Sequence, residues 1–112
     1  MVAVKSYTRG AQVAPKKVRL ILDEVRGKRV DEAMAILRFM QSPHARTIAK
    51  AVRSAAANAE NNYNMDPRHL QITRAFVGDG VKVRRMTPRA RGRADIIIRR
   101  RSNITIIVEE GA

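Results

Sequence analysis

A dense run of basic side chains is the part of this sequence best equipped to bind a partner. Residues 81–101 read VKVRRMTPRARGRADIIIRRR, with Asp95 as the one acidic residue among them. Unpaired charges at this density are too costly to bury, so the run is solvated, disordered or laid against an anionic partner. Guanidinium groups also present planar forks of donors that match phosphate oxygens. The nine basic residues are Lys82, Arg84, Arg85, Arg89, Arg91, Arg93, Arg99, Arg100 and Arg101.

The charge of the whole chain points to the same kind of partner. The 112 residues carry a formal net charge of +13 at pH 7. Solubility does not need this excess, so nucleic acid is the first candidate partner and an anionic membrane the second. The absence of cysteine excludes disulfides and thiolate metal sites and fits a reducing compartment. No apolar run approaches the ~20 residues of a membrane span, and we expect no signal peptide.

The residue types that enzymes use do not gather in this sequence. His44 and His69 stand alone, without cysteine or carboxylates at metal-ligand spacing. The acidic pairs at 23–24 and 109–110 are typical of ordinary surface. The GDG at residues 78–80 is too short for a phosphate-binding fingerprint. The sequence therefore predicts no enzyme, no metal site and no cofactor.

The basic run has the pattern of a β-hairpin. Pro88 and Gly92 mark a tip, and β-prone residues lie on both sides, at 81–86 and at 94–99. At ~3.3 Å per residue, six residues of free arm reach roughly 20 Å. We call residues 81–101 the ribbon and expect it to project from a small body made of residues 1–80 and 102–112. At 112 residues, body and ribbon suit a single domain.

The ribbon continues into arms that are apolar enough to join a sheet. Residues 70–77 and 104–108 mirror each other about the tip. Between them, Gly78, Asp79 and Gly80 allow two interpretations: a tight turn that closes a separate hairpin, or a bulge or kink where the ribbon leaves the sheet. The matched arms favour the bulge or kink.

The remaining segments predict one short strand and three helices. Residues 2–8 alternate loosely as a strand that Arg9 and Gly10 break. Residues 15–26 form an amphipathic helix with Pro15 in its first turn and Gly27 after its end. The buried stripe of this helix is predicted to be Val18, Ile21, Leu22 and Val25.

Two more helices follow, each with a candidate N-cap. Residues 31–40 form a helix that Asp31 caps, and its apolar face includes Leu37. An alanine-rich helix opens at Ser42, its N-cap, and Pro43, and it runs to about Asn61. A turn follows at residues 66–67.

Two groups of helical cations accompany the ribbon. Lys16 and Lys17 oppose the macrodipole at a helix N-terminus, a small cost that contact with an anionic partner would offset. Arg46, Lys50 and Arg53 follow the spacing i, i+4, i+7 and share one face of the third helix. Both a solvated face and a phosphate-binding face fit these groups.

Several segments together resemble one known family. TPRARGRAD (residues 87–95) with SNITI (102–106) resembles the tunnel hairpin of the universal large-subunit ribosomal protein family numbered twenty-two. APKKVRLILDEVRGK (14–28), VDEAMAILRF (30–39) and a third helix that ends in AENNY match the same family in the same order. The likeness covers nearly the whole chain. Three positions depart from the family pattern. Thr87 stands where members often have Met or another apolar residue, Asn103 where many have His, and Ala14 where Ser is frequent.

The resemblance implies a fold and a place. The fold is α+β, with three helices packed on a small three-stranded antiparallel sheet and a long protruding basic hairpin. The place is the large ribosomal subunit in the cytoplasm. The chain would be a structural constituent that binds and organises rRNA during assembly. Its hairpin tip would line the nascent-peptide exit tunnel, opposite a loop of large-subunit protein four.

The implied partners are large-subunit rRNA, neighbouring large-subunit ribosomal proteins and the nascent peptide, with no membrane and no homo-oligomer. The expected rRNA-binding residues are Lys16, Lys17, Arg19, Arg46, Lys50, Arg53, Lys82, Arg84, Arg85, Arg99, Arg100 and Arg101. The expected tunnel-lining tip is Met86, Thr87, Pro88, Arg89, Ala90, Arg91, Gly92 and Arg93.

Two alternatives start from the same basic charge. An architectural DNA-binding protein with a basic β-ribbon arm has a similar composition, although such proteins usually grip the duplex as dimers and no dimer seam is evident here. A cationic membrane binder needs bulky apolar anchors on an amphipathic helix, and the ribbon has none.

Overall fold

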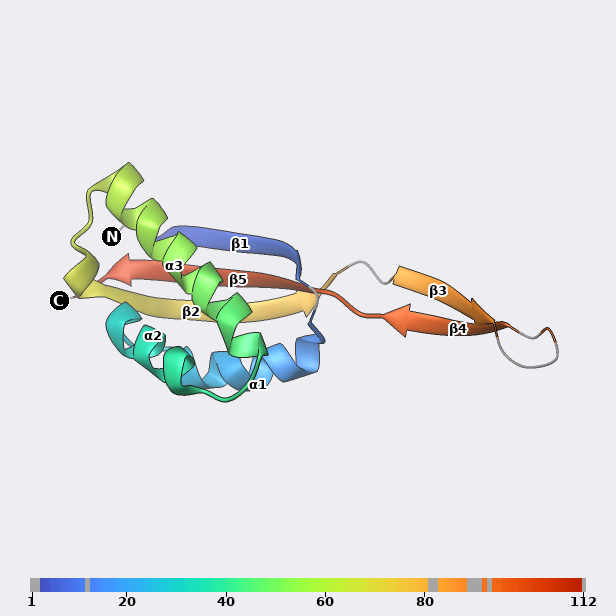
Figure 1. Cartoon of the computed structure of the whole chain (residues 1–112). Coiled ribbons are helices and arrows are strands. Elements are labelled where there is room, and N and C mark those ends of the chain that lie inside the picture. Colours follow the sequence, from blue (N-terminus) through green and yellow to red (C-terminus); the bar gives the residue numbers. More distant parts are fainter. Residues whose placement is uncertain (1–2, 12, 81–82, 89–91, 93, 112) are drawn as a thin grey trace.

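The structure is a computed structural model, and it describes residues 3–11, 13–80, 83–88, 92 and 94–111. For residues 83–88 and 94–99 the description is of the backbone. The elements are β1 (Val4–Ala11), α1 (Pro15–Val25), α2 (Val30–Phe39), α3 (His44–Tyr63), the 3-10 helix η1 (Pro67–His69), β2 (Leu70–Asp79), β3 (Val83–Pro88), β4 (Ala94–Arg99) and β5 (Ser102–Glu110) (Figure 1).

The strands form two antiparallel sheets of unequal size. The larger sheet has the order β1-β5-β2, and the second sheet consists of β3 and β4. The smaller sheet extends away from the body (Figure 1), and the molecule measures 64 × 26 × 18 Å. The predicted α+β architecture, with three helices, a three-stranded antiparallel sheet and a protruding hairpin, is therefore confirmed.

The core lies between the three-stranded sheet and the helices. Ile104, Ile106 and Val108 alternate along the central strand and are fully buried. α3 crosses the sheet (Figure 1), and its buried alanines leave room for close approach to β1 and β5. The stripe predicted for α1 is confirmed, because Val18, Ile21, Leu22 and Val25 are all buried.

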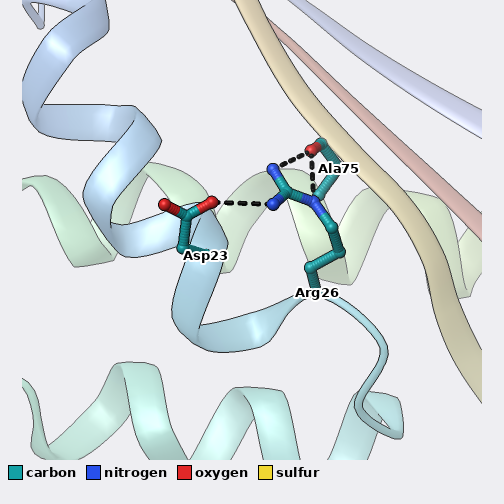
Figure 2. Close-up of polar contacts among 3 residues, drawn as sticks. All are labelled: Asp23, Arg26 and Ala75. Carbon is teal, nitrogen blue, oxygen red and sulfur yellow. Dashed lines mark hydrogen bonds and ion pairs between the residues drawn. The ribbon is translucent and has the colours of Figure 1, made fainter.

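The outer edge of β2 is covered by the connection between α1 and α2. Gly27 N donates to Ile72 O, and Ile72 N donates to Lys28 O, both at 2.9 Å. Arg26 donates to Ala75 O through Nε at 3.1 Å and Nη2 at 2.7 Å, while Nη1 contacts Asp23 Oδ1 at 2.7 Å (Figure 2). These bonds satisfy backbone groups that an uncovered edge strand would leave open to pairing with another chain.

The starts of two helices differ from prediction. α2 begins at Val30 with Arg29 as its N-cap, so the prediction that Asp31 caps it is wrong. An isolated antiparallel β-bridge between Arg29 and Gln71 holds the backbone of Arg29 in an extended conformation. Asp31 lies in the first turn of α2, where its negative charge interacts favourably with the helix dipole. α3 begins at His44 rather than at Ser42, although Ser42 Oγ accepts a bond from His44 N at 3.3 Å.

Later boundaries also differ. α3 continues to Tyr63 and ends where Asn64 adopts a left-handed backbone with φ 54°. The turn predicted at residues 66–67 is the start of η1, where Asp66 Oδ1 accepts a bond from Arg68 N at 3.0 Å. That backbone bond lowers the pKa of the Asp66 carboxyl.

One predicted break in the strands is wrong, and the alternative of a separate turn at residues 78–80 is ruled out. β1 does not end at Arg9 and Gly10, because a register shift between Thr8 and Ala11 carries the strand onward. No separate turn forms at residues 78–80. Gly78 pairs with Asn103, and Gly80 N donates to Arg101 O at 2.8 Å. Pairing resumes between Val83 and Arg99; the predicted bulge or kink falls partly outside the described residues.

Candidate nucleic-acid interface

The ribbon positions its residues on two strands that pair only with each other. The described pairs run from Val83 opposite Arg99 to Pro88 opposite Ala94. β3 contains Arg84, Arg85, Met86, Thr87 and Pro88 of the predicted set. At the tip Gly92 has φ +72°, the left-handed conformation expected of a tip glycine. Lys82, Arg89, Ala90, Arg91 and Arg93 lie outside the described residues.

The base of the ribbon is tied to β1 and to the segment that follows it. Arg101 Nη1 donates to Gly10 O at 3.3 Å, and the buried Ser102 Oγ donates to Val13 O at 2.6 Å. Asn103 accepts from Gly10 N at 3.0 Å and donates to Asp79 O at 3.4 Å. Arg101 is thus partly buried and engaged with the body, whereas Arg100 is exposed.

The helical cations are on the surface of α1 and α3. α1 and α3 both start on the side of the body from which the ribbon leaves (Figure 1). All six predicted side chains are exposed, and none forms an ion pair with a described carboxylate. Their charges are therefore available to a partner. The six are Lys16, Lys17, Arg19, Arg46, Lys50 and Arg53.

A groove between α2 and α3 adds a cation that the sequence analysis missed. Its volume is about 920 Å³, and its lining includes Arg38, Arg46 and Arg53. Phe39 and Met40 contribute apolar surface beside them. Arg38 lies in the last turn of α2, and its position near α3 depends on how the two helices pack. The helix spacing of α3 alone could not reveal this third arginine.

Neither membrane-crossing nor metal-binding features are found in the described part of the chain. No helix there is both long and apolar enough to span a bilayer. No three His, Asp or Glu side chains among the described residues gather as a metal site.

Fold and surface together define a class: a small basic α+β protein that displays cations on a projecting ribbon and on two helices. Residues 6–109 match the family described as Ribosomal protein L22p/L17e. The chain belongs to this family. It is accordingly a structural ribosomal protein rather than an enzyme.

Individual relatives agree with the family assignment. Large ribosomal subunit protein uL22 of Desulforamulus reducens is 47% identical over 106 residues, which cover 95% of this chain and 94% of the relative. The protein of the same name from Dehalococcoides mccartyi is 45% identical over 107 residues, covering 96% and 98%. That of Roseiflexus castenholzii is 48% identical over 107 residues, covering 96% and 95%. The predicted family and location, the large ribosomal subunit in the cytoplasm, are confirmed.

Proposed function

We propose that this chain binds and organises large-subunit rRNA during assembly, and that its hairpin tip lines the nascent-peptide exit tunnel. The observation that carries the proposal is the ribbon, a basic two-stranded sheet that extends from the body without a third strand. Such a ribbon is marginal in water, and its like charges repel. A polyanion that surrounds the ribbon supplies the stabilisation that a core would otherwise give.

The binding energy comes mainly from phosphate contacts. Each phosphate that a cation neutralises releases counterions, so affinity falls as salt rises. If all nine basic residues of the ribbon make one contact each, log K against log salt has a slope of about −6 to −8. The exposed cations of α1 and α3 add a second contact area on the body. Phosphate contacts fix position, and the shape of the folded RNA provides specificity.

The tunnel part of the proposal rests on the form of the tip. A two-stranded ribbon is narrow enough to pass between RNA helices, and its described arms end at Pro88 and Ala94. Pro88 stiffens the chain there, while Gly92 allows a left-handed turn. The partners would be rRNA, neighbouring large-subunit proteins and the nascent peptide, with one copy of the chain in each subunit.

Footprinting on large-subunit rRNA fragments across a salt series tests the rRNA part. In one full-length variant, Arg84, Arg85, Arg99 and Arg100 become Gln, and in a second, Lys16, Lys17, Arg19, Arg46, Lys50 and Arg53 become Gln. The matched control is Arg29→Gln with Arg68→Gln, exposed cations outside both predicted groups. We expect the ribbon variant to lower the salt slope by about 3. The helix variant should lose a separate set of protected nucleotides, and the control should bind like wild type.

Two results would contradict the rRNA part. If the control changes the slope of log K against log salt by the same amount per removed charge, the chain binds polyanions without a defined site. Protection of duplex DNA as strong as that of structured rRNA would favour the architectural DNA-binding alternative.

Cross-linking in stalled ribosomes tests the tunnel part separately. A photoreactive residue is placed at successive positions of the nascent peptide. We expect cross-links to residues 86–93 from a narrow range of positions. Cross-links to other proteins or to RNA, with none to this segment, would remove the tunnel role and leave rRNA binding intact.

A further inference from the structure

The helices leave one face of the three-stranded sheet uncovered. Along β1, Val4 and Ser6 are buried, whereas Lys5, Tyr7 and Arg9 between and after them are exposed. Because alternate residues of a strand point to opposite faces, Lys5 and Tyr7 share the face away from the helices, and Arg9 lines the same hollow as Tyr7. We call this face of the sheet the open face.

Two aromatic side chains lie in one row across the open face. Tyr7 on β1 and Phe76 on β2 both pair with Thr105 of the central strand. Tyr7 and Phe76 are 55% and 50% exposed, yet Thr105 between them is only 5% exposed. Directly opposed residues on neighbouring strands lie roughly 5 Å apart, so the two rings flank Thr105 and cover it. Their outer surfaces remain free to contact a partner.

Cations stand on both sides of this aromatic row. The next row pairs Lys5 with Ile107 and Arg74 with Ile107, which places an exposed cation on each outer strand. On the other side, toward the ribbon, lies the exposed Arg9. The open face therefore combines flat apolar rings with positive charge, and it continues into the base of the ribbon.

A hollow of about 410 Å³ lies between the aromatic row and the ribbon. Tyr7, Arg9, Asp79 and Asn103 contribute to its lining. Arg9 and Asp79 give this hollow one cation and one carboxylate, which suit a phosphate oxygen and the donors of a base edge or of a ribose hydroxyl, respectively.

We propose that the open face binds an unpaired segment of RNA. Bases stack on Tyr7 and Phe76, and Lys5, Arg9 and Arg74 contact the phosphates. The inference rests on the proposed rRNA binding and gives it a ligand class, single-stranded nucleotides. Aromatic platforms flanked by cations bind single strands because every base has a flat face. A duplex keeps its bases stacked on one another and has none to offer these rings.

The charge of the open face favours RNA over an apolar protein partner. A protein partner that covered Tyr7 and Phe76 would also cover Lys5, Arg9 and Arg74. Removing these three charges from water is unfavourable unless each one pairs with a carboxylate of the partner. An RNA strand supplies anions at regular intervals beside its bases.

The test uses the full-length protein and fluorescence anisotropy with three probes. The probes are a single-stranded RNA ten-mer, the same backbone without bases, and an RNA duplex. The test variant carries Tyr7→Leu and Phe76→Leu, which remove the rings but keep apolar bulk beside Thr105. The control carries Tyr63→Leu, which removes an exposed aromatic side chain from the end of α3. Thermal melts check that both variants fold.

We expect the test variant to bind the ten-mer roughly ten- to a hundredfold more weakly, and the control to match wild type. Binding of the backbone probe, binding of the duplex and the salt slopes should not change, because no charge is removed. Unchanged ten-mer binding by the test variant overturns the inference. If wild type still protects rRNA in the footprinting assay, the proposed function survives that result. Equal losses on all three probes also overturn the inference.

A second measurement identifies the occupant directly. A photoreactive residue replaces Tyr7 in protein assembled into large subunits. Cross-links to rRNA support the inference. Cross-links only to a ribosomal protein overturn it and assign the open face to a protein partner.

Discussion

The body and the ribbon share one long pair of antiparallel segments but are stabilised in different ways. In the body β2 pairs with β5. The chain leaves β2 at Asp79 to form β3, returns as β4 and re-enters the body at Ser102, the first residue of β5. In the body, β5 lies between two strands and beneath α3. In the ribbon each strand has one neighbour.

Composition accounts for the difference. β5 places Ile104, Ile106 and Val108 in the core at alternate positions. The ribbon has basic residues at nine of its 21 positions, and such a segment cannot bury enough apolar surface to offset its ordering entropy. The body is therefore expected to fold on the strength of its own core, and the ribbon to depend on its partner. Four pairs of variants test how the body and the ribbon are stabilised.

The largest effect is expected from a core truncation in the body. Leu22 is fully buried, and Leu22→Ala should lower the free energy of unfolding by about 2–5 kcal/mol. The four-residue ribbon variant with Gln for Arg84, Arg85, Arg99 and Arg100 should change that free energy by less than about 0.5 kcal/mol. Urea unfolding followed by circular dichroism measures both. Comparable losses would mean that ribbon and body unfold as one cooperative unit.

The second effect concerns the junction between the two regions. Ser102→Ala leaves the Val13 carbonyl without its 2.6 Å bond in a buried place, at a cost of about 1–3 kcal/mol. The control is Ser54→Ala on the exposed side of α3, where alanine has the higher helix propensity and stability should not fall. A Ser102→Ala protein as stable as wild type would show that the junction does not anchor β5.

The sequence predicted those features that depend on local patterns. The helical spacing of Val18, Ile21, Leu22 and Val25 was enough to predict the buried face of α1. The symmetry of the arms about Pro88 and Gly92 was enough to predict the two paired arms of the ribbon. Family resemblance then predicted the α+β arrangement of the body.

Features set by long-range pairing could not be predicted in this way. Arg29 replaces Asp31 as the N-cap of α2 because of a bridge to Gln71, far away in sequence. The aromatic row exists only because β5 inserts between β1 and β2 and brings Tyr7 and Phe76 to the same partner residue. Lys5, Arg9 and Arg74 also come from separate strands and form no dense basic run in the sequence. The pattern of basic runs therefore could not indicate them.

The third prediction concerns the covered edge of β2. Arg26→Ala removes both bonds to Ala75 O and should lower the free energy of unfolding by about 1–2 kcal/mol, after allowance for solvent screening of a half-exposed side chain. Asp23→Ala removes only the exposed ion pair and should cost less than about 0.5 kcal/mol. Amide exchange along β2 should quicken in the first variant alone. Equal effects would assign the stabilisation to the ion pair instead.

The smallest expected effect gives the most closely matched comparison. Gly27, after α1, has φ +81°, and Gly92, at the tip of the ribbon, has φ +72°. A Cβ built on either glycine meets nothing within 4 Å, so an alanine there introduces backbone strain without a clash. Gly27→Ala should lower the free energy of unfolding by about 1 kcal/mol, because the strain is present only in the folded body.

Gly92→Ala carries the same strain in a segment that no core holds in place. In the free protein residue 92 can leave the left-handed conformation without disturbing the core, so the free energy of global unfolding measured in urea should match that of wild type. When RNA or the ribosome holds the tip in its turn, the strain returns, and binding to the rRNA fragments should weaken by roughly fivefold for about 1 kcal/mol. A loss of global stability equal to that of Gly27→Ala would show that the ribbon is ordered by the body after all. Unchanged binding together with unchanged stability would mean that the bound tip does not use the left-handed turn.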